Sequence, residues 1–128
     1  MINEAYHMVE EFQNAARQPV SDLPRQLDKE RVSIRVEWMI EEIKEFLEAD
    51  TIDEQADALT DLLYYLLGTY VEMGIKPDAL FCVIHNANMQ KLEAKEGIIK
   101  DKNGKVLKPL HWNHPDNAIR KLLTNEGD

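Results

Sequence analysis

Acidic residues gather in one short stretch of the chain, at spacings that suit metal chemistry. Between Glu37 and Asp61 there are ten acidic residues and one basic residue, Lys44. This stretch therefore carries the whole net charge of −9, and the rest of the chain balances to zero. Carboxylates inside a fold normally pair with a base, take up a proton or bind a cation. Oxygen ligands alone favour a hard ion, Mg²⁺ or Mn²⁺, over zinc.

The first acidic group is expected on a helix from Asp28 to Ala49, with Asp28 as its cap. At 100° per residue, one arc of this helix is apolar: it holds Val36, Met39, Ile40, Ile43, Phe46 and Leu47. Glu42 lies beside that arc, near Phe46, and Glu45 adjoins Glu42 three residues later. Glu41 lies next to Glu45 on the outer side, which is typical of a solvated face.

The second acidic group is expected on a helix over Glu54–Met73, after a break at Asp50–Asp53 in which Asp53 is the cap. Gly74 suits the left-handed position that ends a helix. Most of the circumference is apolar: Leu59, Leu62, Leu63, Leu66, Leu67, Tyr70 and Val71. Such a helix should be central, so its remaining sector with Asp57 and Asp61 should point into the domain. The two groups predict a divalent-cation site and metal-assisted attack of water on phosphorus, with a solvated acidic surface as the alternative.

The other elements indicate an all-α fold. Further helices are expected over Glu4–Arg17, from Pro77 to about Glu93, and over Asn117–Leu123 with Asp116 as cap. Pro19 and Pro24 place a loop between the first two helices, and Asn103-Gly104 predicts a two-residue hairpin turn. We expect one domain over residues 1–128: a four- to five-helix bundle with a small C-terminal hairpin or loop.

Composition limits the function further. The single cysteine, Cys82, indicates a reducing compartment, and the uncharged run Leu62–Val71 is only half of what a bilayer needs. The first residues lack the apolar core of a signal peptide, so a soluble cytoplasmic protein is expected. An acidic chain is a poor direct binder of nucleic acid.

Three stretches resemble the all-α nucleotide pyrophosphohydrolases, which include MazG-like enzymes, dimeric dUTPases and phosphoribosyl-ATP pyrophosphohydrolase. The first is Glu41–Glu45 with the acidic residues that lead into Asp61–Leu67, and the second is His85–Leu92, similar to the family's Asn/Lys helix. The third, Gly104–Pro109 with Trp112 and Pro115-Asp116, resembles a phosphoribosyl-ATP pyrophosphohydrolase-like subgroup. The resemblance covers about Arg31 to Asp116.

The resemblance implies a helix bundle that forms a homodimer or homotetramer and hydrolyses a nucleoside triphosphate, or a related nucleotide, to the monophosphate and pyrophosphate. It implies Mg²⁺, with Mn²⁺ as a substitute, on Glu42, Glu45 and Asp61. Many members carry Glu three residues before that Asp, where this chain has Ala58. Asp57 can take its place because residues four apart share a helix face. Glu54 is then a further ligand or a supporting residue.

Other roles follow from the same resemblance. Glu41 would orient or deprotonate the attacking water. Asn88, Lys91 and Lys108 would bind phosphate oxygens. Arg35 could contact phosphate. The alternative is a structural ion pair with Glu37 or Asp28.

Several alternatives stay open. Phosphoribosyl-ATP, dUTP, dCTP and modified nucleotides are all compatible substrates, and a non-catalytic helical dimer with a binding or scaffold role is the competing function. Trp38 or Trp112 could stack on a base, although packing is the commoner role of such a side chain. Cys82 and His85 with His111 and His114 have zinc-like spacing, but the apolar neighbours of Cys82 are typical of a core thiol.

Overall fold

The computed structural model describes residues 1–95 and 97–125, and within them the protein is helical. The α-helices are α1 (Ile2–Ala15), α2 (Lys29–Glu48), α3 (Ile52–Met73), α4 (Pro77–Gln90) and α5 (Asp116–Asn125), with a short 3₁₀ helix η1 (Lys91–Glu93) after α4. The described part of the chain contains no β-strand, which confirms the all-α class. None of its helices is both long enough and apolar enough to cross a membrane. The chain divides into two compact units, Met1–Pro77 and Asp78–Asp128.

Local signals set the ends of the two acidic helices. The Asp28 side chain caps α2 as expected, since its Oδ1 accepts from the Arg31 amide at 2.8 Å. The cap of α3 is Thr51, because the Glu54 amide donates to its Oγ1 at 3.1 Å. The prediction of Asp53 was wrong: the helix begins at Ile52, and Asp53 lies in its first turn. Gly74 ends α3 at φ 68°, as predicted.

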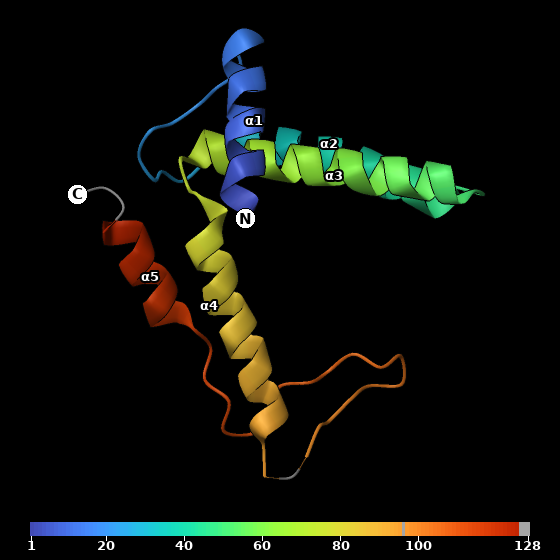
Figure 1. Cartoon of the computed structure of the whole chain (residues 1–128), viewed down its shortest axis with the longest axis vertical. Helices are drawn as coiled ribbons and strands as arrows, with labels where there is room; N and C mark the ends of the chain where they lie inside the picture. Colours follow the sequence, from blue (N-terminus) through green and yellow to red (C-terminus); the bar gives the residue numbers. More distant parts are fainter. Residues whose placement is uncertain (96, 126–128) are drawn as a thin grey trace. The chain divides into compact units, whose positions relative to one another are not determined.

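In the first unit, α2 lies along α3 and α1 crosses α3 (Figure 1). The three-residue connection between α2 and α3 returns the chain alongside itself. A small core joins Tyr6 and Val9 of α1 to Leu67 and Val71 of α3. Helix α3 therefore contacts both other helices of its unit, as its composition predicted.

The apolar arc of α2 and the middle of α3 remain largely uncovered within one chain. Ile43 is 50% exposed and Leu47 82% exposed on α2, while Leu59 and Leu63 of α3 are about half exposed. The acidic sector of α3 is accordingly only partly turned inward. Asp61 is half-buried, but Asp57 is exposed.

A buried polar network ties the three helices of the first unit together. Arg35 Nε donates to Glu72 Oε2 at 2.8 Å, and Arg35 Nη2 donates to Gln13 Oε1 at 2.9 Å. Arg31 forms a second ion pair with Glu72, at 2.6 Å. Gly68 makes room for this network, because a Cβ there would lie 2.4 Å from Gln13 Oε1 and 2.8 Å from Arg35 Nη1. The glycine thus lets the Arg35 guanidinium lie against the backbone of α3.

The second unit holds α4, η1, a looped segment and α5. Lys100 and Val106 form an isolated antiparallel bridge in place of a hairpin with strands. The turn between them is one residue longer than predicted: the Gly104 amide donates to Asp101 O, and the Asp101 amide donates to Lys105 O. Gly104 alone has positive φ there, at 85°, whereas a two-residue type I′ turn needs it at both central positions. Asp116, predicted as a cap, instead lies in the first turn of α5.

Candidate metal centre

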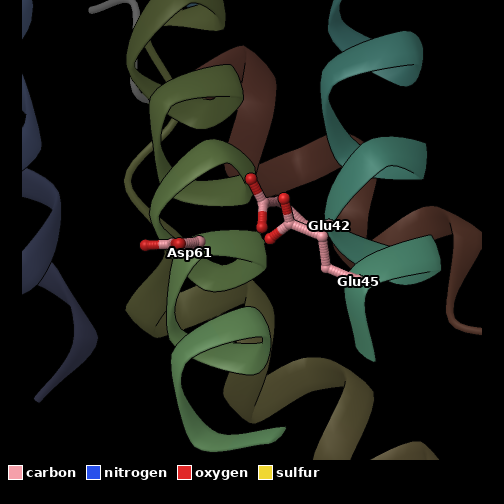
Figure 2. Close-up of side chains that lie close together, drawn as sticks. All are labelled: Glu42, Glu45 and Asp61. Carbon is pink, nitrogen blue, oxygen red and sulfur yellow. The ribbon is translucent and has the colours of Figure 1, made fainter. Parts of the chain in front are cut away.

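Three carboxylates from two helices meet at one place in the first unit. Glu42 and Glu45 reach from α2 toward α3, which carries Asp61 (Figure 2). One oxygen of each carboxylate lies within 4.8 Å of the others. Among the described residues, this is the one group of three or more His, Cys, Asp or Glu side chains close enough to share a metal ion.

The carboxylates of the cluster repel one another, and one of their oxygens has no hydrogen-bond partner. Glu42 is buried, and its Oε2 is the one buried side-chain oxygen or nitrogen among the described residues without a hydrogen-bond partner. Burial raises the pKa of Glu42 to about 7, assisted by a hydrogen bond and charge repulsion from Glu45 and by the charges of Asp61 and Asp57. Burial also raises the pKa of Asp61, with further repulsion from Asp57 and Glu45. A cation would relieve all of these unfavourable interactions.

Glu72 shows what a neutralised buried carboxylate looks like in the same unit. Although its burial opposes ionisation, hydrogen bonds and charges from Arg31 and Arg35 lower its pKa below the usual 4.5. Within residues 1–95 and 97–125, no lysine or arginine forms a comparable ion pair with Glu42, Glu45 or Asp61. The two sites differ in their counter-charge: Glu72 has two arginines, and the acidic cluster has no such partner among the described residues.

The remaining predicted acids lie around this cluster. Asp57 is not among the three that share a ligand distance, but it lies four residues before Asp61 on α3, and its charge raises the pKa values of Glu42 and Asp61. Glu41 is exposed on α2, next to Glu42 in the chain. Glu54 is not one of the three clustered carboxylates either. Its Oε2 accepts a hydrogen bond from the Asp50 amide at 3.4 Å.

The predicted phosphate-binding residues lie in the second unit. Asn88 is exposed on α4, and Lys91 starts η1. Lys91 and Lys108 both approach the Trp112 ring, with Nζ at 4.9 and 5.6 Å from its centroid. The structure thus brings two lysines that are distant in the sequence to the same indole ring.

Two expectations about single residues were wrong. Arg35 does form a structural ion pair, but with Glu72, and Arg31 and Glu72 were not predicted to take part. The only sequence signal was Glu72 itself, an acid at the end of the most apolar helix. Cys82 is exposed, so it is not a core thiol, and it does not join the histidines in a metal-binding group within the described residues.

The fold and the cluster define a helical protein with an all-oxygen site suited to a hard divalent cation. The sequence profile of phosphoribosyl-ATP pyrophosphohydrolase matches residues 9–88, more than half of the chain. The chain therefore belongs to the phosphoribosyl-ATP pyrophosphohydrolase family, a family of divalent-metal-dependent pyrophosphohydrolases within the MazG-like all-α superfamily. Comparison with curated proteins gives no match.

Proposed function

We propose that the protein is a Mg²⁺-dependent nucleotide pyrophosphohydrolase, which also accepts Mn²⁺. It would convert a nucleoside triphosphate, or a related nucleotide, and water to the nucleoside monophosphate and pyrophosphate. The observation that supports this best is the Glu42–Glu45–Asp61 cluster, whose buried Glu42 Oε2 has no protein partner. A hard cation fits this donor set, because every available ligand atom is a carboxylate oxygen.

In this proposal Glu42, Glu45 and Asp61 hold the ion, and Asp57 adds a carboxylate from the preceding turn of α3. The bound ion supplies positive charge to the phosphate oxygens and lowers the pKa of water. Glu41, an exposed carboxylate next to Glu42 in the chain, orients the attacking water and accepts its proton. Asn88, Lys91 and Lys108 donate hydrogen bonds to phosphate oxygens.

We further propose that residues 1–128 act as one domain and form a homodimer or homotetramer. The family match supports a single domain, because it runs through Pro77 into α4. Exposed apolar side chains on α2 and α3, including Ile43, Leu47 and Leu59, support association with a second copy. The single cysteine is consistent with a reducing compartment, and we place the protein in the cytoplasm.

The test is pyrophosphate release from a panel of nucleotides, with and without Mg²⁺. The panel includes phosphoribosyl-ATP, dUTP, dCTP and modified triphosphates. Wild type is compared with Glu42→Gln and with Glu37→Gln, which removes an exposed carboxylate from the same helix. Metal-dependent release that Glu42→Gln abolishes and Glu37→Gln retains is the expected result. No release from any substrate, together with no effect of Mg²⁺ on thermal stability, would favour the non-catalytic scaffold.

A further inference from the structure

Trp112 is fixed against α4 by its polar edge. The indole Nε1–H donates to the carbonyl oxygen of Ala87 at 2.7 Å, and the ring is half-buried. Ala87 is itself buried on α4, one turn before Lys91. This bond connects the segment that follows the Lys100–Val106 bridge to the C-terminal half of α4. The position of the ring is therefore set by the backbone of a helix.

Two ammonium groups lie at this one ring. Lys91 Nζ is 4.9 Å and Lys108 Nζ 5.6 Å from the indole centroid, both within the range of cation–π attraction. Lys91 begins η1, directly after α4, and Lys108 lies four residues before Trp112, so the ring is what they share. In the described part of the chain neither lysine forms an ion pair. Two positive charges beside one ring, neither with a counter-ion, attract an anion of two or more charges.

Trp112 also borders an open cavity of about 600 Å³ in the second unit. The residues that line it include Gln90, Glu93, Lys95 and Asn113. This volume lies within the range of small-molecule sites. A ligand whose anionic part meets the two lysines therefore has room for a polar body beside the same ring.

We infer that Trp112 is a positioning residue that holds Lys91 and Lys108 as a binding site for the polyphosphate of a nucleotide. The inference deepens the proposed function and rests on it for the identity of the substrate. The cation–π contacts restrict both flexible side chains before the ligand arrives, which reduces the entropy lost on binding. Loss of the ring should then weaken phosphate binding through the lysines and in no other way.

The experiment is calorimetric titration of the full chain with inorganic tripolyphosphate and with a non-hydrolysable α,β-methylene triphosphate, in EDTA. We expect Lys108→Gln and Lys91→Gln each to weaken binding about tenfold, since each removes a charge-assisted hydrogen bond. Lys102→Gln is the matched control: it removes an exposed lysine from the turn between Lys100 and Val106 and should change the affinity less than twofold.

A double-mutant cycle tests the positioning role. Trp112→Leu should weaken binding about as much as Lys108→Gln, and the two changes together should cost little more than either one. Trp112→Phe keeps an aromatic face but loses the bond to Ala87, so it should recover part of the affinity. If circular dichroism shows that Trp112→Leu does not fold, Trp112→Phe and the two lysine variants still test the positioning role.

Three results would overturn the inference: no binding of either probe, unchanged affinity in both lysine variants, or full additivity of Trp112→Leu and Lys108→Gln. Because EDTA removes the metal, these titrations need no turnover. Binding by this site without hydrolysis would leave the inference standing and remove the proposed function. Hydrolysis with an affinity that does not depend on either lysine would remove the inference and the phosphate-binding role proposed for Lys91 and Lys108, but would leave the metal-dependent hydrolysis standing.

Discussion

Replacing Glu42 with glutamine should stabilise the metal-free protein at alkaline pH. Burial and the neighbouring acids raise the pKa of Glu42 from 4.5 to about 7, so the folded chain holds this proton more tightly than the unfolded chain does. The folded protein therefore loses stability as the pH rises from about 4.5 through 7. At 1.36 kcal/mol for each pKa unit, the loss amounts to about 3 kcal/mol at pH 8. Glutamine carries no charge at any pH, so the Glu42→Gln variant should not lose this stability.

The assay is urea unfolding in EDTA at pH 5 and pH 8. At pH 8 we expect Glu42→Gln to exceed wild type by up to about 3 kcal/mol, which is about 10 °C in Tm for a chain of this size. At pH 5 the difference should fall below about 1 kcal/mol. The control, Glu37→Gln, lies exposed on the same helix and should stay within about 0.5 kcal/mol of wild type at both pH values.

Addition of Mg²⁺ should reverse this order at pH 8. The ion stabilises wild type by binding only the folded chain, whereas the variant lacks a ligand. The reasoning is refuted if Glu42→Gln is less stable than wild type in EDTA at pH 8, or if the difference does not change between pH 5 and pH 8. Either result would mean that the Glu42 carboxylate is already neutralised or solvated.

Other consequences concern the same unit. The rise in Tm on adding Mg²⁺ should grow between pH 6 and pH 8, because below about pH 7 a proton competes for Glu42; a pH-independent rise would contradict this. Glu72→Gln should cost about 3–5 kcal/mol in urea at pH 7, since it leaves Arg35 buried beside a neutral group; a cost below 1 kcal/mol would show that the pair is dispensable. Because the pKa of Glu72 is lowered, its contribution to wild-type stability is present above pH 4.5 and lost as the pH falls toward the lowered value. Gly68→Ala should cost about 1–3 kcal/mol, because the added Cβ meets Gln13 Oε1 at 2.4 Å; wild-type stability of this variant in urea would argue against the close approach.

The sequence predicts well where the signal is local. Asp28 and Gly74 end their helices as predicted, because a side-chain acceptor and a left-handed conformation act within one turn. Thr51 was missed in favour of Asp53 because both residue types make good caps, and only the backbone shows which carbonyls and amides the helix leaves free. The three-residue turn ending at Gly104 was likewise missed. The Asn-Gly pair favours a two-residue turn, and nothing local in the sequence indicated the longer one.

Contacts between distant residues were harder to predict. The periodicity of α2 and α3 was enough to select Glu42, Glu45 and Asp61 as candidate ligands, because spacing fixes which face of a helix a residue occupies. The partner of Arg35 lies 37 residues away, and no spacing rule links it to Glu72. The approach of Lys91 and Lys108 to Trp112 depends in the same way on how the chain returns to α4, which composition does not encode.

The most direct test of the central claim is a crystal of the protein grown with Mn²⁺ and a non-hydrolysable nucleotide, examined by anomalous scattering. The account predicts a manganese peak bound by carboxylate oxygens of Glu42, Glu45 and Asp61, at distances of about 2.0–2.4 Å. A crystal of Glu37→Gln should show the same peak, and a crystal of Asp61→Asn should show a weaker one or none. A manganese ion bound elsewhere, or no ion while Glu42 stays buried without a partner, would contradict the account.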